Sequence, residues 1–128
     1  MARLLVLYSQ PSHPAAFDHY YFKKHAPLAR TIPGLRSYTV NAAPIGVIAS
    51  GQKPYLAAGL EFDGQGRLAR RAAPVEGSAP YLVAVLEFDS MDALQSAMAS
   101  PEGQATAADL ANFAQAGVTI LAFEAKTL

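Results

Sequence analysis

The stretch that decides the fold is Tyr81-Leu-Val-Ala-Val-Leu-Glu-Phe-Asp89. Side chains alternate along an extended strand, so Tyr81, Val83 and Val85 point to one face. The other face receives the remaining apolar residues: Leu82, Ala84, Leu86 and Phe88. Both faces of the strand are therefore apolar, and a sheet built around it needs a cover on each side.

Two other segments have the same character. Residues 4–8 are apolar throughout and stop at the turn-forming Ser9-Gln10-Pro11-Ser12, and residues 118–123 are apolar on both faces. Residues 35–40, with Tyr38 in the middle, predict a further strand. The apolar run near the N-terminus is far shorter than a signal-peptide core or a membrane span, so we interpret it as the first strand.

A helix is expected after the first strand. Pro14 suits a first helical position, and an apolar face follows at helical spacing: Phe17, Tyr21, Leu28 and Ile32. This helix should kink or end near Pro27, because the proline ring crowds the carbonyl of Lys23 and pushes Ala26 away from helical angles. The Pro33-Gly34 pair should close the element.

Two more helices are expected before the last strand. Ser90 or Asp89 can cap the first of them, Ser100 can cap the second ahead of Pro101, and Gly117 should end it. The resulting order is the split βαβ arrangement of ferredoxin-like domains, so the predicted fold class is α+β with an antiparallel sheet. Helices cover only one sheet face, and an identical subunit would cover the other, which predicts a homodimer or larger assembly.

Residues 42–79 interrupt this order between the second and third strands. They are rich in Gly, Ala and Pro, and they contain a near copy of the deciding stretch, Tyr55-Leu-Ala-Ala-Gly-Leu-Glu-Phe-Asp63. One copy is too few for a solenoid. We expect it to form an extra strand that turns at residues 63–66 and returns from Arg67, making an inserted hairpin appended to the sheet.

Composition limits the class of protein. A chain of 128 residues suits one hydrophobic core, so residues 1–128 are taken as a single domain. Ten basic residues balance ten acidic ones, which argues against nucleic acid or an anionic membrane as a partner. The absence of cysteine excludes thiolate chemistry and is compatible with a cytoplasmic location. Only 16% of residues are charged, which again indicates a surface buried against a partner.

Further motifs follow one another along the chain: Tyr20-Tyr-Phe-Lys-Lys-His-Ala-Pro-Leu28, Ile32-Pro-Gly-Leu35, Ser100-Pro-Glu-Gly-Gln104, Asp109 and Asn112-Phe113. Together with residues 81–90, they resemble the EthD family of dimeric α+β barrel proteins over most of the chain outside the insertion. The resemblance implies a homodimer with a ferredoxin-like fold that holds a small apolar or aromatic organic molecule. The family takes its name from a protein of bacterial alkyl-ether degradation, which implies an oxygenase system as a partner.

The resemblance also implies several activities. The protein would be an oxidoreductase of the monooxygenase type, a proton-transfer enzyme such as an isomerase or dehydratase, or an oxygenase accessory. It would act in a degradation or secondary-metabolite pathway, and it would need no cofactor. The alternative is a non-catalytic dimeric protein that binds a small molecule or stabilises a partner. Related dimeric barrels carry several chemistries, so the fold leaves this choice open.

His25 is the first candidate catalytic residue. It lies beside the expected helix break and shares a helical side with Tyr21, four residues earlier. A histidine there could act as a general acid or base near neutral pH, with the Tyr21 hydroxyl orienting it or the substrate. The alternative is structural, with the imidazole binding carbonyls that Pro27 leaves unpaired.

Tyrosines and glutamates supply the candidate substrate-binding residues. Tyr8, Tyr38 and Tyr81 lie on predicted strands, where they could line a ligand cavity or simply pack in the core. Glu61 and Glu87 hold equivalent places in the two copies, each on the face of its strand's tyrosine. A carboxyl facing an apolar cavity would have a raised pKa and could act as a base, whereas the alternative is a solvated or cross-strand ion pair.

Other clusters are weaker candidates. His13, His19 and His25 recur at equal intervals, but on a helix they point about 120° apart and cannot converge on one metal ion. No metal site or cofactor is predicted, and nothing else in the sequence supports haem. The insertion carries a positive cluster suited to an acidic ligand or to a solvated hairpin arm: Arg67, Arg70 and Arg71. Phosphate loops, dinucleotide motifs and nucleophile elbows do not occur in the sequence.

Overall fold

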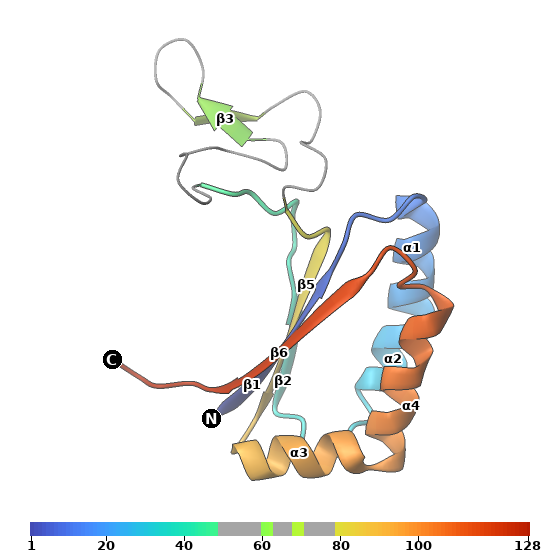
Figure 1. Ribbon diagram of the computed structural model, residues 1–128, viewed down its shortest axis with the longest axis vertical. Coiled ribbons are helices and arrows are strands. Elements are labelled where there is room, and N and C mark those ends of the chain that lie inside the picture. The colour runs from blue at the N-terminus through green and yellow to red at the C-terminus, as the bar shows by residue number, and fades with distance from the viewer. Residues whose placement is uncertain (49–59, 63–67, 71–78) are drawn as a thin grey trace.

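The computed structural model describes residues 1–48, 60–62, 68–70 and 79–128, and its centre is a four-stranded sheet (Figure 1). The strands are β1 (Ala2–Tyr8), β2 (Ser37–Val40), β5 (Leu82–Phe88) and β6 (Val118–Glu124). Their order is β2-β5-β1-β6, and every neighbouring pair is antiparallel. The deciding stretch supplies β5, an interior strand. The predicted α+β class and ferredoxin-like order are confirmed.

The helices gather on one side of the sheet, and within the described residues no helix covers the other side (Figure 1). They are α1 (Pro14–Tyr20), the π-helical turn η1 (Tyr21–His25), α2 (Ala26–Ala29), α3 (Met91–Ala99), α4 (Pro101–Asp109) and the 3₁₀ turn η2 (Leu110–Asn112). The predicted caps are confirmed: the Ser90 hydroxyl accepts from the Ala93 N–H at 3.1 Å, and Ser100 accepts from Gly103 at 3.0 Å. In the described part of the chain no helix is long and apolar enough to cross a membrane.

The first helical segment widens ahead of Pro27 instead of breaking there. In η1 the chain is π-helical, and the Ala26 N–H donates to the carbonyl of Tyr21, five residues back. The expectation that Ala26 leaves helical angles is wrong, since its φ is −61° and its ψ −44°. A wider turn gives the proline ring room without ending the helix, and such turns are frequent at functional sites. This one carries both Tyr21 and His25.

The core lies between the helices and the sheet face that they cover. Alternate residues of β1 and β5 are buried there: Ala2, Leu4, Val6, Tyr8, Leu82, Ala84, Leu86 and Phe88. The Tyr8 ring meets Phe17 and Tyr21 edge to face, with centroids 5.5 and 5.6 Å apart. Phe113, from the segment after α4, packs against the same rings. This aromatic packing restricts the positions of the two buried tyrosines.

The opposite face of the sheet is apolar as well. The residues on its central strands are only half-buried: Leu5, Leu7, Val83 and Val85. On the edge strand β6, which pairs with β1, Leu121 and Phe123 belong to this face and are 48% and 40% exposed. We call these six residues the outer face. An apolar surface of this kind normally lies against another surface.

Two short strands of the insertion fall within the described residues. β3 (Leu60–Phe62) and β4 (Leu68–Arg70) pair antiparallel, with Leu60 opposite Arg70. They form a sheet of their own, so the expectation that they extend the main sheet is wrong. A hairpin pairs its two strands with each other and does not require the edge of β2. The predicted turn at residues 63–66 lies outside the described residues.

Candidate functional site

Three side chains form a hydrogen-bonded chain in the core. Nδ1 of His25 lies 2.9 Å from Oδ2 of Asp109, and Nε2 of His25 lies 3.4 Å from the Tyr8 hydroxyl. The three residues come from η1, from the end of α4 and from β1. His25 is only 4% exposed. A buried imidazole with a carboxylate on one nitrogen and a hydroxyl near the other is suited to acid–base chemistry.

Asp109 is held by two further donors. The Tyr20 hydroxyl donates to its Oδ1 at 2.6 Å, and the Asn112 amide donates to the same oxygen at 2.9 Å. Burial acts to raise the pKa of Asp109, but its hydrogen bonds and the nearby imidazole outweigh burial and lower that pKa. Asp109 is therefore ionised at neutral pH, and an ionised carboxylate can only accept hydrogen bonds.

The protonation state of His25 follows from this environment. Burial lowers the pKa of His25, and the hydrogen bond and charge of Asp109 offset only part of that shift. The ring is therefore neutral at neutral pH. Because Asp109 is an acceptor, the proton lies on Nδ1, and Nε2 presents its lone pair toward Tyr8. A neutral imidazole in this tautomer can act as a base at Nε2.

Tyr21 and Tyr38 form a second hydrogen-bonded pair nearby. Their hydroxyls lie 2.5 Å apart and join η1 to the edge strand β2. Burial raises the pKa of Tyr8, Tyr21 and Tyr38, so all three remain protonated and can donate. Tyr21 was expected to orient His25 or the substrate through its hydroxyl. It contacts the imidazole with its ring, at a centroid distance of 5.3 Å, and Asp109 orients His25 instead.

A cavity of about 40 Å³ lies beside these groups. Its polar lining consists of Tyr8, Tyr21, His25, Tyr38 and Thr106. The volume exceeds the roughly 10–15 Å³ that a single water molecule needs. Sites for small organic ligands measure about 300–1,000 Å³. In this conformation the space beside His25 therefore admits water and excludes an organic substrate.

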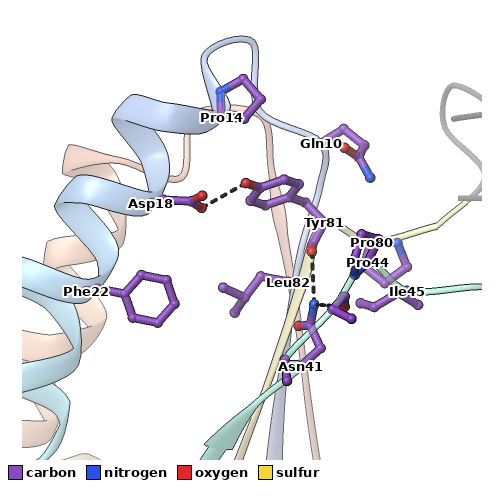
Figure 2. A pocket seen from close by; sticks show the side chains of 12 residues that line it. Gln10, Pro14, Asp18, Phe22, Asn41, Pro44, Ile45, Pro80, Tyr81 and Leu82 are labelled. Atoms are coloured by element: carbon purple, nitrogen blue, oxygen red, sulfur yellow. Dashed lines mark hydrogen bonds between the residues drawn. The ribbon is translucent and has the colours of Figure 1, made fainter. Parts of the chain in front are cut away.

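A larger cavity, of about 500 Å³, lies between α1, the loop after β2 and the start of β5 (Figure 2). The Tyr81 hydroxyl donates to Oδ1 of Asp18 at 2.8 Å in its wall. Burial, together with this hydrogen bond, raises the pKa of Tyr81 to about 12, so the phenol stays a donor. We call this space the Asp18 cavity.

Two of the predicted substrate-binding residues lie away from His25. Strand alternation predicted Tyr81 on the outer face, but its ring packs against Phe17 on the helix side, because Tyr81 precedes the first residue of β5. Glu87 lies opposite Arg3 on the outer side of the sheet, and Oε2 of Glu87 is 3.4 Å from Nε of Arg3. The cross-strand ion pair considered for Glu87 is thus what the structure shows. His25, Tyr21, Tyr8 and Tyr38 do come together.

Asp109 is not among the site residues that the sequence predicted. One local signal could have found it: Asp109 is the last residue of α4, where an acidic side chain meets the negative end of the helix dipole. A carboxylate in so unfavourable a place indicates a compensating partner elsewhere in the fold. Tyr20, its strongest neutral donor, gave no such signal because its neighbour Tyr21 fits the buried helix face.

The remaining candidates gain no support from the structure. His13 and His19 are exposed, and in the described ranges no three His, Cys, Asp or Glu side chains lie close enough to hold a metal ion. Some side chains fall outside what the structure describes: Glu61, Arg67, Arg70 and Arg71.

The fold and this site define a class: ferredoxin-like α+β proteins whose helices cover one sheet face and enclose a polar pocket against it. The sequence model of the EthD domain matches residues 9–117, and the chain belongs to the EthD family. An uncharacterized 11.0 kDa protein of Rhodococcus erythropolis, from the thcB-thcC intergenic region, is 35% identical, with 100% of this chain and 98% of that protein covered. The family resemblance found in the sequence is confirmed.

Solved structures agree with this assignment. An EthD family protein from Bacillus halodurans is 32% identical, with a TM-score of 0.68 over 98% of this chain and 99% of that one. SnoaB from Streptomyces nogalater, a cofactor-independent oxygenase, is 15% identical, with a TM-score of 0.55 over 99% and 94%. A dimeric ferredoxin-like protein from Thermobifida fusca is 14% identical, with a TM-score of 0.56 over 95% and 88%. The last two likenesses concern the fold alone.

Proposed function

We propose that this protein binds a small apolar or aromatic organic molecule between its helices and its sheet and moves a proton on that molecule through His25. The observation that carries the proposal is the buried chain from Asp109 through His25 to Tyr8. Asp109 sets the tautomer, Nε2 of His25 is the base, and Tyr8 is a protonated phenol beside it.

The proton-transfer step follows from these roles. Nε2 of His25 takes a proton from a C–H or O–H bond of the ligand, and the ionised Asp109 stabilises the imidazolium that results. The Tyr8 hydroxyl donates a hydrogen bond to the oxygen on which negative charge develops. Such a step suits an isomerase or a dehydratase. SnoaB, which has a similar fold, is a cofactor-independent oxygenase, so this fold is compatible with chemistry that needs no cofactor.

Substrate access requires a rearrangement, because the cavity of about 40 Å³ beside His25 is much smaller than the roughly 300–1,000 Å³ of a small-molecule site. The hydroxyl pair of Tyr21 and Tyr38 ties η1 to β2 at the wall of this cavity. We expect this pair to separate when a ligand enters, which leaves both phenols free to donate to it.

The test is turnover of candidate aromatic and ether substrates by the wild type and by His25→Gln. General acid–base catalysis contributes about a hundredfold or more, so a loss of that size is expected for His25→Gln. His19→Gln, a change at an exposed histidine of α1, is the matched control and should keep the full rate. An unchanged rate in His25→Gln would remove this residue from the mechanism.

One observation favours a second candidate function, that of a non-catalytic binding protein or an oxygenase accessory. The space beside His25 is much smaller than a substrate. In that case the wild type would bind ligand and return it unchanged, and His25→Gln would bind it equally well. Co-purification with an oxygenase system would then be the informative measurement.

The outer face supports a homodimer. We infer that the outer faces of two copies pack together, with the sheets about 10 Å apart. Leu121 and Phe123 are large, apolar and exposed in one copy, and pairing the faces would bury them. The Thermobifida fusca protein of similar fold is dimeric, which is compatible with this arrangement.

A further inference from the structure

The Asp18 cavity has the dimensions of a ligand site. Its volume of about 500 Å³ falls within the range of about 300–1,000 Å³ that small-molecule sites occupy. Apolar side chains form much of its wall, among them Phe22, Ile45 and Leu82. Figure 2 shows Phe22 and Leu82 below the Asp18–Tyr81 hydrogen bond.

The described wall of the Asp18 cavity carries a negative charge and no positive one. Of the twelve described residues that line it, Asp18 alone is charged. Its Oδ1 accepts the Tyr81 hydroxyl, and among the described residues Asp18 forms no salt bridge. The Tyr81 hydroxyl meets one oxygen of this carboxylate, and an ammonium group could donate to the other. The cavity is thus electrostatically complementary to a positive ligand.

The two other polar side chains in the wall, Gln10 and Asn41, have structural partners, and Nε2 of Gln10 donates to the Ala79 carbonyl at 3.3 Å. The Asn41 amide donates to the Ala43 carbonyl at 2.9 Å, and Oδ1 of Asn41 accepts the Val83 N–H at 2.8 Å. Asn41 therefore holds the loop after β2 against β5. Charge recognition of a ligand by the described wall consequently depends on Asp18, with Tyr81 fixing the orientation of its carboxylate.

Aromatic rings add to the attraction for a cation. Phe22 is 51% exposed although it is a large apolar residue, and it lies at this cavity together with the Tyr81 ring. Aromatic faces attract ammonium groups within about 6 Å, most strongly where water is excluded.

We propose that the Asp18 cavity binds an apolar or aromatic molecule carrying a protonated amino group. The ammonium donates to Asp18, and the apolar body lies against Phe22 and Leu82. This inference goes beyond the proposed function, because the Asp18 cavity is separate from the cavity beside His25 and its occupancy does not depend on proton transfer by His25.

The test is calorimetric titration with three probes of one shape: benzylamine, benzyl alcohol and benzoate. Benzylamine is a cation at neutral pH and should bind about tenfold tighter than the alcohol, because its hydrogen bond to Asp18 is charge-assisted. Benzoate should bind most weakly. Asp18→Asn keeps an acceptor for Tyr81 and should weaken benzylamine about tenfold, with little change for benzyl alcohol. Asp92→Asn, at an exposed position of α3, should change neither affinity.

A second variant tests the proposal independently in case Asp18→Asn does not fold. Ile45→Trp fills the cavity and should abolish binding of the amine and the alcohol alike. Equal affinity for amine and alcohol in the wild type, preferred binding of benzoate, or no binding of the amine would overturn the proposal. Benzylamine should bind His25→Gln as tightly as it binds the wild type. Loss of turnover therefore tests proton transfer by His25, and loss of benzylamine binding tests the Asp18 cavity.

Discussion

Nδ1 of His25 and Oδ2 of Asp109 lie 2.9 Å apart, although 84 residues separate them in the chain. The contact joins the π-helical turn η1 to the last residue of α4. It places an ionised carboxylate against a neutral, buried imidazole, so each group sets the electrostatic environment of the other. The chemistry proposed for the site depends on this contact.

Removal of the Asp109 charge should lower the pKa of His25 further. Burial already lowers that pKa, and Asp109 works in the opposite direction. In Asp109→Asn the effect of burial is unopposed, so the imidazole should protonate at a lower pH than in the wild type. Proton NMR titration of the histidine rings measures this directly, with exposed His19 as the internal control. A His25 pKa that rises or stays constant would contradict the assigned contact.

Stability should decline in mild acid because of His25. Its pKa in the folded protein lies below the ordinary value of 6.5. The unfolded chain therefore binds a proton at a higher pH than the folded one, and the free energy of unfolding falls as pH drops below about 6.5. Urea unfolding at neutral pH and near pH 5 should show this loss in the wild type and in His19→Gln. If the free energy of unfolding falls equally in the wild type and in His25→Gln, groups other than His25 cause the acid sensitivity.

Gly103→Ala should destabilise the protein, although alanine favours helices. A Cβ at this position would overlap the carbonyl oxygen of Ala97 and lie 2.8 Å from Cα of Met98, so α4 would have to move away from α3. Helix propensity would add about 1 kcal/mol of stability, whereas overpacking costs about 1–3 kcal/mol. We expect a net loss in urea unfolding. Gln104→Ala, at the exposed neighbouring position, should stay within about 0.5 kcal/mol of the wild type.

The hydroxyls of Tyr21 and Tyr38 should be energetically coupled. Each change to phenylalanine removes one partner and leaves the other hydroxyl unpaired, at a cost of about 1–3 kcal/mol. The double variant removes both, so its loss should be smaller than the sum of the two single losses. A double-mutant cycle in urea measures the coupling, which we expect to reach about 1 kcal/mol. Additive losses would show that the hydroxyls do not stabilise each other.

Dimerisation of the protein should depend on the outer face of the sheet and not on the face that the helices cover. Leu121 and Ile120 are neighbours on β6, point to opposite faces and are 48% and 49% exposed. Leu121→Glu places a charge in the proposed dimer contact and should convert the protein to monomers. Ile120→Glu, the matched control, should remain dimeric. Sedimentation measurements distinguish the two, and a dimeric Leu121→Glu would exclude the outer face as the contact.

Much of the fold could be predicted because its signals are local. The alternation in the deciding stretch predicted β5 with two apolar faces, and Ser90 and Ser100 predicted the starts of α3 and α4. The π-helical turn could not be predicted in the same way. Pro27 indicates a disturbance of the helix, but whether the helix breaks or widens depends on how the residues before it pack against the core.

The candidate site could be predicted only in part. The spacing of His25 and Tyr21 predicted that they share a helical side, and their rings do lie close together at one cavity. Their partners could not be inferred. Asp109, Tyr8 and Tyr38 lie on three other elements, and nothing in the sequence near His25 indicates which of them meets which nitrogen or hydroxyl.

The sequence by itself determined the strands, the helix caps, the family and the apolar outer face, because alternation and capping involve residues that are neighbours in the chain. Only the tertiary structure decided that His25 is oriented by Asp109, that Tyr21 pairs with Tyr38 and that Asp18 faces a cavity of its own. These contacts join elements distant in sequence, and their distances are set by the packing of helices on the sheet.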